Sequence, residues 1–187
     1  MFRFKKLAFL VIVATLILTA CGDGGESEEV GSSCAPDCTY ADMVICYPQL
    51  GAESDWRTAN TASIKETADQ VGAKLIFSDA QQKQENQISA MRACIAQGVD
   101  IIALPPVVED GWDAVLTEAQ NAGIPVIIVD RSVSADSSLY AAHIGSNMVL
   151  EGERAAEEFN KAMPNGGAVL ELSGTTGSGA AVGRAEG

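Results

Sequence analysis

Short apolar runs alternate with longer segments of helical periodicity along most of this chain. The strand-like runs are residues 43–47, 74–78, 100–104, 125–129, 139–144 and 168–172. The central runs are almost continuously apolar, which is typical of strands that helices cover on both faces. Strands that alternate in this way with helices predict an α/β fold with a doubly wound parallel sheet.

The helical segments between these strands carry recognisable start and stop signals. They are residues 55–71, 82–97, 111–121 and 148–163. Asp55 is expected to cap the first helix and Gly72 to end it. The residues expected to face the core from this helix are Trp56, Ala59, Ala62, Ala68 and Val71. Trp112 is expected to pack inward from the third helical segment.

Polar side chains gather where the predicted strands end, and parallel sheets bind ligands at that edge. The candidate site residues are Trp56, Arg57, Gln81, Lys83, Asp130, Arg131, Ser146, Asn147 and Arg184. Sugar hydroxyls both donate and accept hydrogen bonds, so carboxylates and guanidinium groups suit them, while an aromatic ring packs on the C–H face of the sugar. The pattern therefore predicts a monosaccharide site.

Three alternatives remain open for these residues. Asp130 and Arg131 could simply form an ion pair in a loop, and Trp56 could be an ordinary core residue. Residues 81–86 could be the solvated start of a helix. The sequence alone does not separate these interpretations from a ligand site.

The N-terminus is typical of an exported lipoprotein. Basic residues in the first six positions precede an apolar segment at residues 7–18, which is shorter than the roughly 20 residues of a membrane-spanning helix. The sequence LTAC then ends at Cys21 and matches a lipobox, which predicts a signal peptide at residues 1–20 and lipidation of Cys21. The alternative is an ordinary signal peptide with an incidental cysteine.

The remaining chain divides into three predicted parts. Residues 21–42 combine the lipidated cysteine with a linker rich in Gly, Ser and acidic residues, a composition that favours a flexible, extended tether. Residues 43–146 are expected to form an N-terminal ligand-binding lobe, and residues 147–187 the start of a C-terminal lobe. The protein is expected outside the cytoplasmic membrane, attached to it through the lipid.

Charge and motifs exclude several function classes. The formal net charge of −13 argues against nucleic acid and against anionic membrane surfaces as partners. The glycine-rich residues 174–179 lack both the G-x-G-x-x-G and the G-K-[ST] pattern. Because no nucleophile–base pair or metal-ligand cluster accompanies them, no enzyme activity, cofactor or metal is expected, and His143 is expected to be structural.

The cysteines beyond Cys21 fall into two pairs. Cys34 and Cys38 could close a small disulfide loop after the linker, and the alternative of two free thiols stays open. Cys46 and Cys94 lie among apolar residues of a predicted strand and a predicted helix. These two are expected to be buried free thiols.

The chain resembles the sugar-binding proteins of ABC importers with the type I periplasmic binding fold, of the ribose and galactose group. Within this group it is most similar to the galactofuranose-binding branch. The resemblance rests on residues 51–57, 79–88, 97–100, 106–112, 124–126, 130–132 and 172–175. It implies a non-catalytic protein that captures a monosaccharide between two lobes and delivers it to ABC permease subunits. A sensor that signals to a membrane kinase or chemoreceptor is the alternative.

The resemblance also assigns roles to particular residues. It implies that Trp56 and Arg57 contact the sugar ring, that Asp130 and Arg131 hold hydroxyls, and that Arg184 reaches in from the second lobe. Residues 146–148 read Ser-Asn-Met, whereas Ser or Ala followed by Asp-Asn is usual in the family. The chain is expected to contain most of the first lobe and only the beginning of the second, and to expose an apolar face of its sheet.

Overall fold

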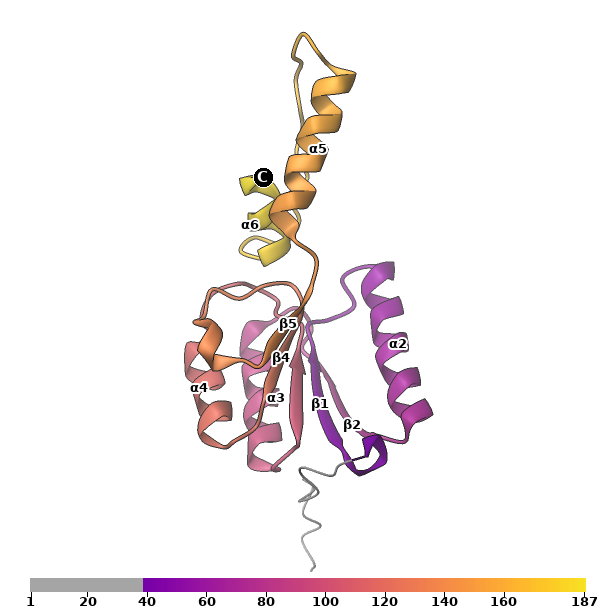
Figure 1. Ribbon diagram of the computed structural model, residues 1–187, viewed down its shortest axis with the longest axis vertical. Coiled ribbons are helices and arrows are strands. Elements are labelled where there is room, and N and C mark those ends of the chain that lie inside the picture. Colours follow the sequence, from indigo (N-terminus) through magenta and orange to yellow (C-terminus); the bar gives the residue numbers. More distant parts are fainter. Residues whose placement is uncertain (1–38) are drawn as a thin grey trace, which may run out of the picture.

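A parallel five-stranded sheet organises the fold, with strand order β2-β1-β3-β4-β5 (Figure 1). The computed structural model describes residues 39–187. The predictions for the signal peptide, for lipidated Cys21 and for the pair Cys34 and Cys38 lie outside the described residues. Within the described part, the predicted α/β fold with a parallel sheet is confirmed.

The elements follow the predicted alternation closely. The strands are β1 (Val44–Gln49), β2 (Lys74–Asp79), β3 (Ile101–Leu104), β4 (Val126–Asp130) and β5 (Ala142–Gly145). The helices are α2 (Asp55–Val71), α3 (Gln84–Ala96), α4 (Asp113–Asn121), α5 (Met148–Ala162) and α6 (Gly179–Glu186). Two short 3-10 turns, η1 (Tyr40–Asp42) and η2 (Ser137–Leu139), precede β1 and β5.

The core lies between the sheet and helices α3 and α4. These two helices cover one face of the sheet and α2 lies on the other (Figure 1). Ile102 and Leu104 of β3 are completely buried, and Trp112 packs into the same cluster as predicted. Their burial removes large apolar side chains from water and supplies the main stabilisation of this lobe.

Strand β5 forms an exposed edge. All its residues are exposed, and Ile144 keeps 63% of its accessible surface. Ile144 is thus an exposed apolar side chain at this edge, whereas the strands β1, β3 and β4 consist of buried and half-buried residues, so an exposed apolar face of the whole sheet is not seen. The prediction that this strand spans residues 139–144 was wrong by several residues, because the chain first forms the turn η2 and pairs with β4 only from Ala142 onward.

The structure of helix α2 contradicts two predictions. Ser54, and not Asp55, caps the helix: its side chain accepts a hydrogen bond from the backbone N–H of Arg57. Trp56 is 58% exposed, so the predicted inward face was wrong; of its five members only Ala68 is buried. The helix turns Arg57 inward instead, because this guanidinium finds carboxylate partners beneath the helix.

Residues 168–172 do not form the sixth strand that their apolar sequence predicts. Among the described residues no neighbouring strand pairs with this segment, so its backbone has no ladder to join. Leu170 and Leu172 are almost fully exposed there. The prediction failed because a parallel strand requires a partner, which apolar composition alone does not supply.

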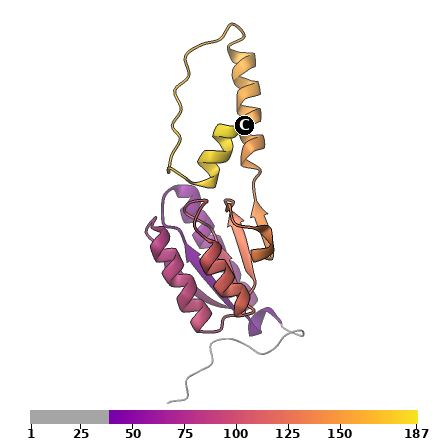
Figure 2. The same cartoon turned by 90° about the vertical axis from the view of Figure 1, so that its left-hand side faces the viewer.

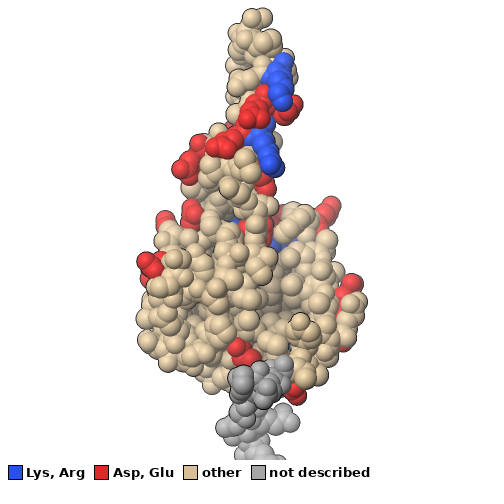
Figure 3. Space-filling view, viewed as in Figure 1, with Lys and Arg blue, Asp and Glu red and all other residues tan. Residues whose placement is uncertain are grey.

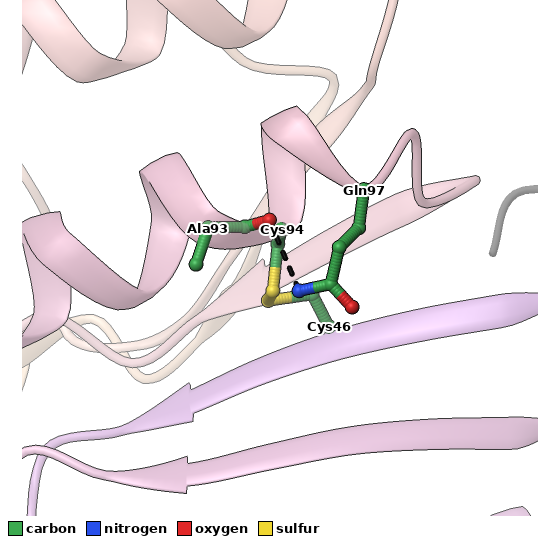
Figure 4. Close-up of a disulfide and its surroundings, with 4 residues drawn as sticks. All are labelled: Cys46, Ala93, Cys94 and Gln97. Atoms are coloured by element: carbon green, nitrogen blue, oxygen red, sulfur yellow. Dashed lines mark hydrogen bonds between the residues drawn. A yellow bond between two sulfur atoms is a disulfide. The ribbon is translucent and has the colours of Figure 1, made fainter. Parts of the chain in front are cut away.

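A disulfide joins Cys46 of β1 to Cys94 of α3 (Figure 4). The expectation of free thiols was therefore wrong. Both residues are buried, at 1% and 2% exposure, and their Cα atoms are 6.2 Å apart. Strand and helix face each other across the core, which brings together two cysteines that are 48 residues apart in sequence.

Helices α5 and α6 form a separate pair beyond the carboxyl ends of the strands (Figures 1 and 2). They pack against each other, and the chain passes into them directly after β5. We refer to them as the upper helices. In the part of the chain that the structure describes, no helix has the length and apolar character needed to cross a bilayer.

Candidate functional site

Four charged side chains form a closed ion network at the carboxyl edge of the sheet. Arg57 of α2 places Nη2 2.5 Å from Oδ2 of Asp130 and 3.5 Å from Oε1 of Glu53. Arg131 also pairs with Glu53, and its Nε lies 3.9 Å from Oδ2 of Asp130. Two guanidinium groups thus alternate with two carboxylates, and the formal charges of the network cancel.

This network is largely removed from water. Arg57 is 1% exposed, and the side chains of Asp130 and Glu53 are 18% and 15% exposed. Burial lowers the pKa of the Arg131 guanidinium, and the nearby carboxylate of Glu53 acts in the opposite direction. Charges in such surroundings interact strongly, so each of the four groups constrains the position of the others.

The backbone at this edge adopts sparsely populated conformations. Asp130 has φ 66°, and Gln81 and Gln82 have φ 54° and 60°. Non-glycine residues rarely occupy this left-handed region, and such strain concentrates at functional sites. Asp130 adopts this conformation as the last residue of β4 and forms the ion pair with Arg57.

Trp56 lies over the network. The Arg57 guanidinium is 4.7 Å from the centroid of the Trp56 ring, a cation–π distance. Because Trp56 is 58% exposed, much of its surface is free to contact a ligand. The alternative that Trp56 is an ordinary core residue is excluded by this exposure.

A second set of polar residues holds Arg57 from below. The side-chain oxygen of Asn60 accepts hydrogen bonds from Tyr47 Oη at 3.1 Å, from Gln49 Nε2 at 3.0 Å and from Arg57 Nη1 at 3.4 Å. Burial raises the pKa of Tyr47, which therefore remains a neutral donor. Arg57 Nε is buried and has no hydrogen-bond acceptor among the described residues.

Gln87 ties together the ends of two strands. It is completely buried on α3, and its Nε2 donates to the carbonyls of Pro48, near the end of β1, and of Pro105, directly after β3. Its Oε1 accepts from the backbone N–H of Val107. Arg131 Nη1 donates to the carbonyl of Val107 at 3.5 Å, so the backbone that Gln87 holds also contacts the ion network.

Replacing Gln87 with methionine is expected to lower the free energy of unfolding by about 3 kcal/mol, because three buried backbone groups lose their partners. Methionine has a similar volume and cannot replace these hydrogen bonds. Urea denaturation measures the change. Gln97→Met, at an exposed position after the same helix, is the control and is expected to change stability by less than about 0.5 kcal/mol. Equal stability of both variants would contradict the assigned role of Gln87.

The ion network borders an open hollow of about 400 Å³ between the sheet edge and the upper helices. We call it the cleft hollow. Its charged and amide lining residues are Glu53, Gln82, Arg131 and Arg184. Arg184 approaches from α6, where Glu151 of α5 holds its guanidinium at 2.7 Å and 2.8 Å. Arg184 in turn lowers the pKa of Glu151 by hydrogen bonding.

The structure gathers some predicted site residues and separates others. Arg131 and Arg184 line the cleft hollow, and Arg57 and Asp130 belong to the network beside it. Gln81 and Lys83 are exposed and do not line this hollow; the neighbouring Gln82 does.

Ser146 and Asn147 line a different hollow, of about 410 Å³, near the connection between β5 and α5. We call it the hinge hollow. The Asn147 side chain caps α5 by accepting from the backbone N–H of Leu150 at 3.0 Å. His143 lines the same hollow, with Nε2 3.3 Å from the carbonyl oxygen of Asp130. No group of metal-ligating side chains occurs in the described part of the chain.

Glu53 is the central residue that sequence reasoning did not select. It contacts both arginines of the network and lines the cleft hollow. A signal was present, because Glu53 precedes Arg57 by four residues. Its contact with Arg131 depends on the fold, since these residues are 78 positions apart.

Acidic side chains are scattered over the visible face, whereas basic ones appear mainly on the upper helices and at their junction with the sheet (Figure 3). The excess of acidic residues, with a net charge of −13, agrees with this distribution. Arg57 and Arg131 at the sheet edge are therefore buried positive charges in a mainly acidic protein, and their carboxylate partners neutralise them.

Comparison with known proteins agrees with this geometry. Residues 47–187 match the periplasmic binding protein domain family. The chain belongs to this family. A curated relative, the galactofuranose-binding protein YtfQ of Escherichia coli K12, is 43% identical over 150 residues, which cover 79% of this chain and 47% of the relative.

Two solved structures of similar proteins support the same assignment. One is the periplasmic binding protein component of the arabinose ABC transporter of Shewanella sp. ANA-3, bound to α- and β-L-arabinofuranose. It is 46% identical with a TM-score of 0.72, covering 76% of this chain and 47% of that one. The other, from Mycobacterium smegmatis in complex with β-D-fucofuranose, is 47% identical with a TM-score of 0.73, covering 77% and 49%.

The chain therefore spans about half the length of the relatives named here. The predicted family and the lobe fold of a type I periplasmic binding protein are confirmed. These relatives are binding proteins, in agreement with the expectation that a periplasmic binding protein of this kind is not an enzyme.

Proposed function

We propose that this chain supplies one wall of a monosaccharide site in an extracytoplasmic binding protein of an ABC importer. The observation that carries the proposal is the neutral network of Glu53, Arg57, Asp130 and Arg131 beside the exposed ring of Trp56. Guanidinium groups can donate to sugar hydroxyls and carboxylates can accept from them without leaving a net charge in the site. The Trp56 ring offers an apolar surface for the C–H face of the sugar.

The site residues proposed to contact the sugar are Trp56, Arg57, Asp130, Arg131 and Arg184, with Glu53 added from the structure. Relatives that bind galactofuranose, arabinofuranose and fucofuranose favour a five-membered sugar ring as the ligand of this protein. Ser146 and Asn147 are proposed to act at the connection between lobes, since they line the hinge hollow.

Import is favoured over sensing because one similar structure is named as a component of an ABC transporter. Under this proposal the sugar-bound, closed protein delivers its ligand to permease subunits. Cys21 is proposed to carry the lipid that holds the protein at the outer side of the membrane, with residues 21–42 as its tether. Residues 43–146 and 147–187 are proposed as the first lobe and the beginning of the second.

The sugar proposal is tested by calorimetry on the full-length gene product. L-arabinose, D-galactose and D-fucose can adopt furanose rings, and myo-inositol, which cannot, is the control. Saturation of the site, at about 100 times the dissociation constant, should stabilise the protein by about 2.7 kcal/mol, visible as a higher melting temperature. Binding of myo-inositol alone, or of none of the sugars, would contradict the proposal.

The lipid anchor is tested separately in cells. In membrane fractionation, the wild-type protein is expected in the membrane fraction. The Cys21→Ala variant should either be released from the membrane or keep its uncleaved signal peptide. Mass spectrometry of the mature N-terminus identifies the acyl chains directly. A wild-type protein without acyl chains on Cys21 would exclude the lipoprotein assignment.

A further inference from the structure

Two segments far apart in sequence meet where the upper helices contact the first lobe. The backbone N–H of Glu109, in the loop between β3 and α4, donates to the carbonyl of Gly177 at 2.8 Å. Gly177 also lies against Val108, since a Cβ atom there would be 3.8 Å from Val108 Cγ1. This contact joins the first lobe to the segment that leads into α6.

A second contact lies two residues after Gly177, at the start of α6. A Cβ atom on Gly179, the first residue of α6, would come within 2.7 Å of Ser132 Oγ, 3.1 Å of Ser132 O and 3.2 Å of Ser132 N. Two of these atoms are backbone and cannot rotate away. Glycine therefore fits at position 179, whereas a residue with a Cβ atom would require α6 or Ser132 to shift.

The first lobe holds its half of this contact in place. Ser132 Oγ donates to Glu109 Oε1 at 2.9 Å, and the backbone N–H of Ser134 donates to the carbonyl of Glu109 at 3.0 Å. Glu109, Ser132 and Gly179 all line the hinge hollow and not the cleft hollow. The contact is thus separate from the residues proposed to touch the sugar.

We propose that Glu109, Ser132, Gly177 and Gly179 form a latch that sets the population of the closed state before sugar binds. This inference rests on the proposed sugar-binding function and adds that the latch controls the affinity for the sugar. An apparent dissociation constant equals the intrinsic constant divided by the fraction of competent protein. A latch that favours closure therefore tightens sugar binding although none of its atoms contacts the sugar.

The variant Gly179→Ala tests the latch in the full-length gene product. The added methyl group should push α6 away from Ser132 and weaken sugar binding about tenfold, through a smaller closed fraction. Small-angle X-ray scattering should show a larger radius of gyration without sugar and the wild-type radius at saturating sugar. Unchanged affinity together with unchanged scattering would overturn the proposal.

Gly183→Ala is the matched control on the same helix. Its Cβ would meet Met148 Cβ at 2.7 Å, a clash of similar severity that lies within the upper helices. It is expected to lower the melting temperature and to leave the sugar affinity within twofold of wild type. A tenfold loss of affinity in this variant as well would assign the effect to general damage and overturn the latch.

A double variant keeps the proposal testable if Gly179→Ala folds poorly. Ser132→Ala removes the nearest atom to the new methyl group, so Ser132→Ala/Gly179→Ala should bind sugar more tightly than Gly179→Ala alone. Additive losses from the two substitutions would contradict a direct contact. If the wild-type protein binds none of the tested sugars, the proposed function fails, and scattering without sugar still decides whether Gly179→Ala opens the molecule.

Discussion

Replacing Arg57 with methionine is expected to lower the free energy of unfolding by about 3 kcal/mol and to weaken sugar binding by about 100-fold. Arg57 is 1% exposed and pairs with Asp130 at 2.5 Å and with Glu53 at 3.5 Å. Without Arg57, Asp130 and Glu53 would share Arg131 as their remaining guanidinium partner in the network, so one buried negative charge would be left uncompensated. Methionine keeps most of the volume, so the loss of charge, and not a cavity, causes the effect.

Urea denaturation and calorimetry measure the two parts of this prediction independently. The matched control is Arg92→Met, which breaks an exposed pair: Arg92 and Glu118 lie 2.7 Å apart on α3 and α4, with side chains 53% and 42% exposed. Exposed pairs of this kind contribute little to stability, so affinity should not change and stability only slightly. If both variants behaved alike, the buried network would have no special role.

Reduction of the Cys46–Cys94 disulfide is expected to have the largest effect on stability. The bond closes a loop with a sequence separation of 48 residues. The chain-entropy relation gives about 4 kcal/mol for a loop of this length, because the cross-link restricts the unfolded chain. Both cysteines are buried in the core, so the reduced thiols keep the apolar contacts and the loss comes mainly from the missing cross-link.

The measurement compares thermal unfolding of the wild-type protein with and without a reducing agent. Reduction should lower the melting temperature by about 10 °C or more for a domain of this size. The variant Cys46→Ala/Cys94→Ala should unfold at the reduced wild-type temperature, apart from small packing differences, and should not respond to the reducing agent. A wild-type protein that melts at the same temperature in both conditions would refute the stabilising role of the bond.

The alternation of apolar runs and helical segments was sufficient to predict the parallel sheet, and Trp112 was correctly placed in its core. These features depend on local periodicity, which every segment carries in its own residues. The positions of Asp130 and Arg131 after a buried strand likewise placed them at the carboxyl edge, where both join one network. Topology turns such positions into proximity, since parallel strands end on the same side.

The errors have a common cause in contacts over long sequence separations. The orientation of Trp56 was wrong because a charged neighbour, Arg57, has its partners beneath the helix and takes the buried position. Cys46 and Cys94 were assigned as free thiols because nothing near either residue indicates the other. Residues 168–172 have strand-like composition, yet a strand also needs a neighbour with which to pair.

Sequence by itself determined the class of fold, the edge at which polar residues gather and the family to which the chain belongs, because these depend on local pattern and order along the chain. Only the tertiary structure decided that Glu53 bridges two arginines, that Cys46 bonds to Cys94 and that Gly179 rests on Ser132. Apart from the contact between Glu53 and Arg57, which are four residues apart, these contacts join residues that are distant in sequence. Their distances are set by how the helices pack on the sheet and how the upper helices meet it, which no single segment encodes.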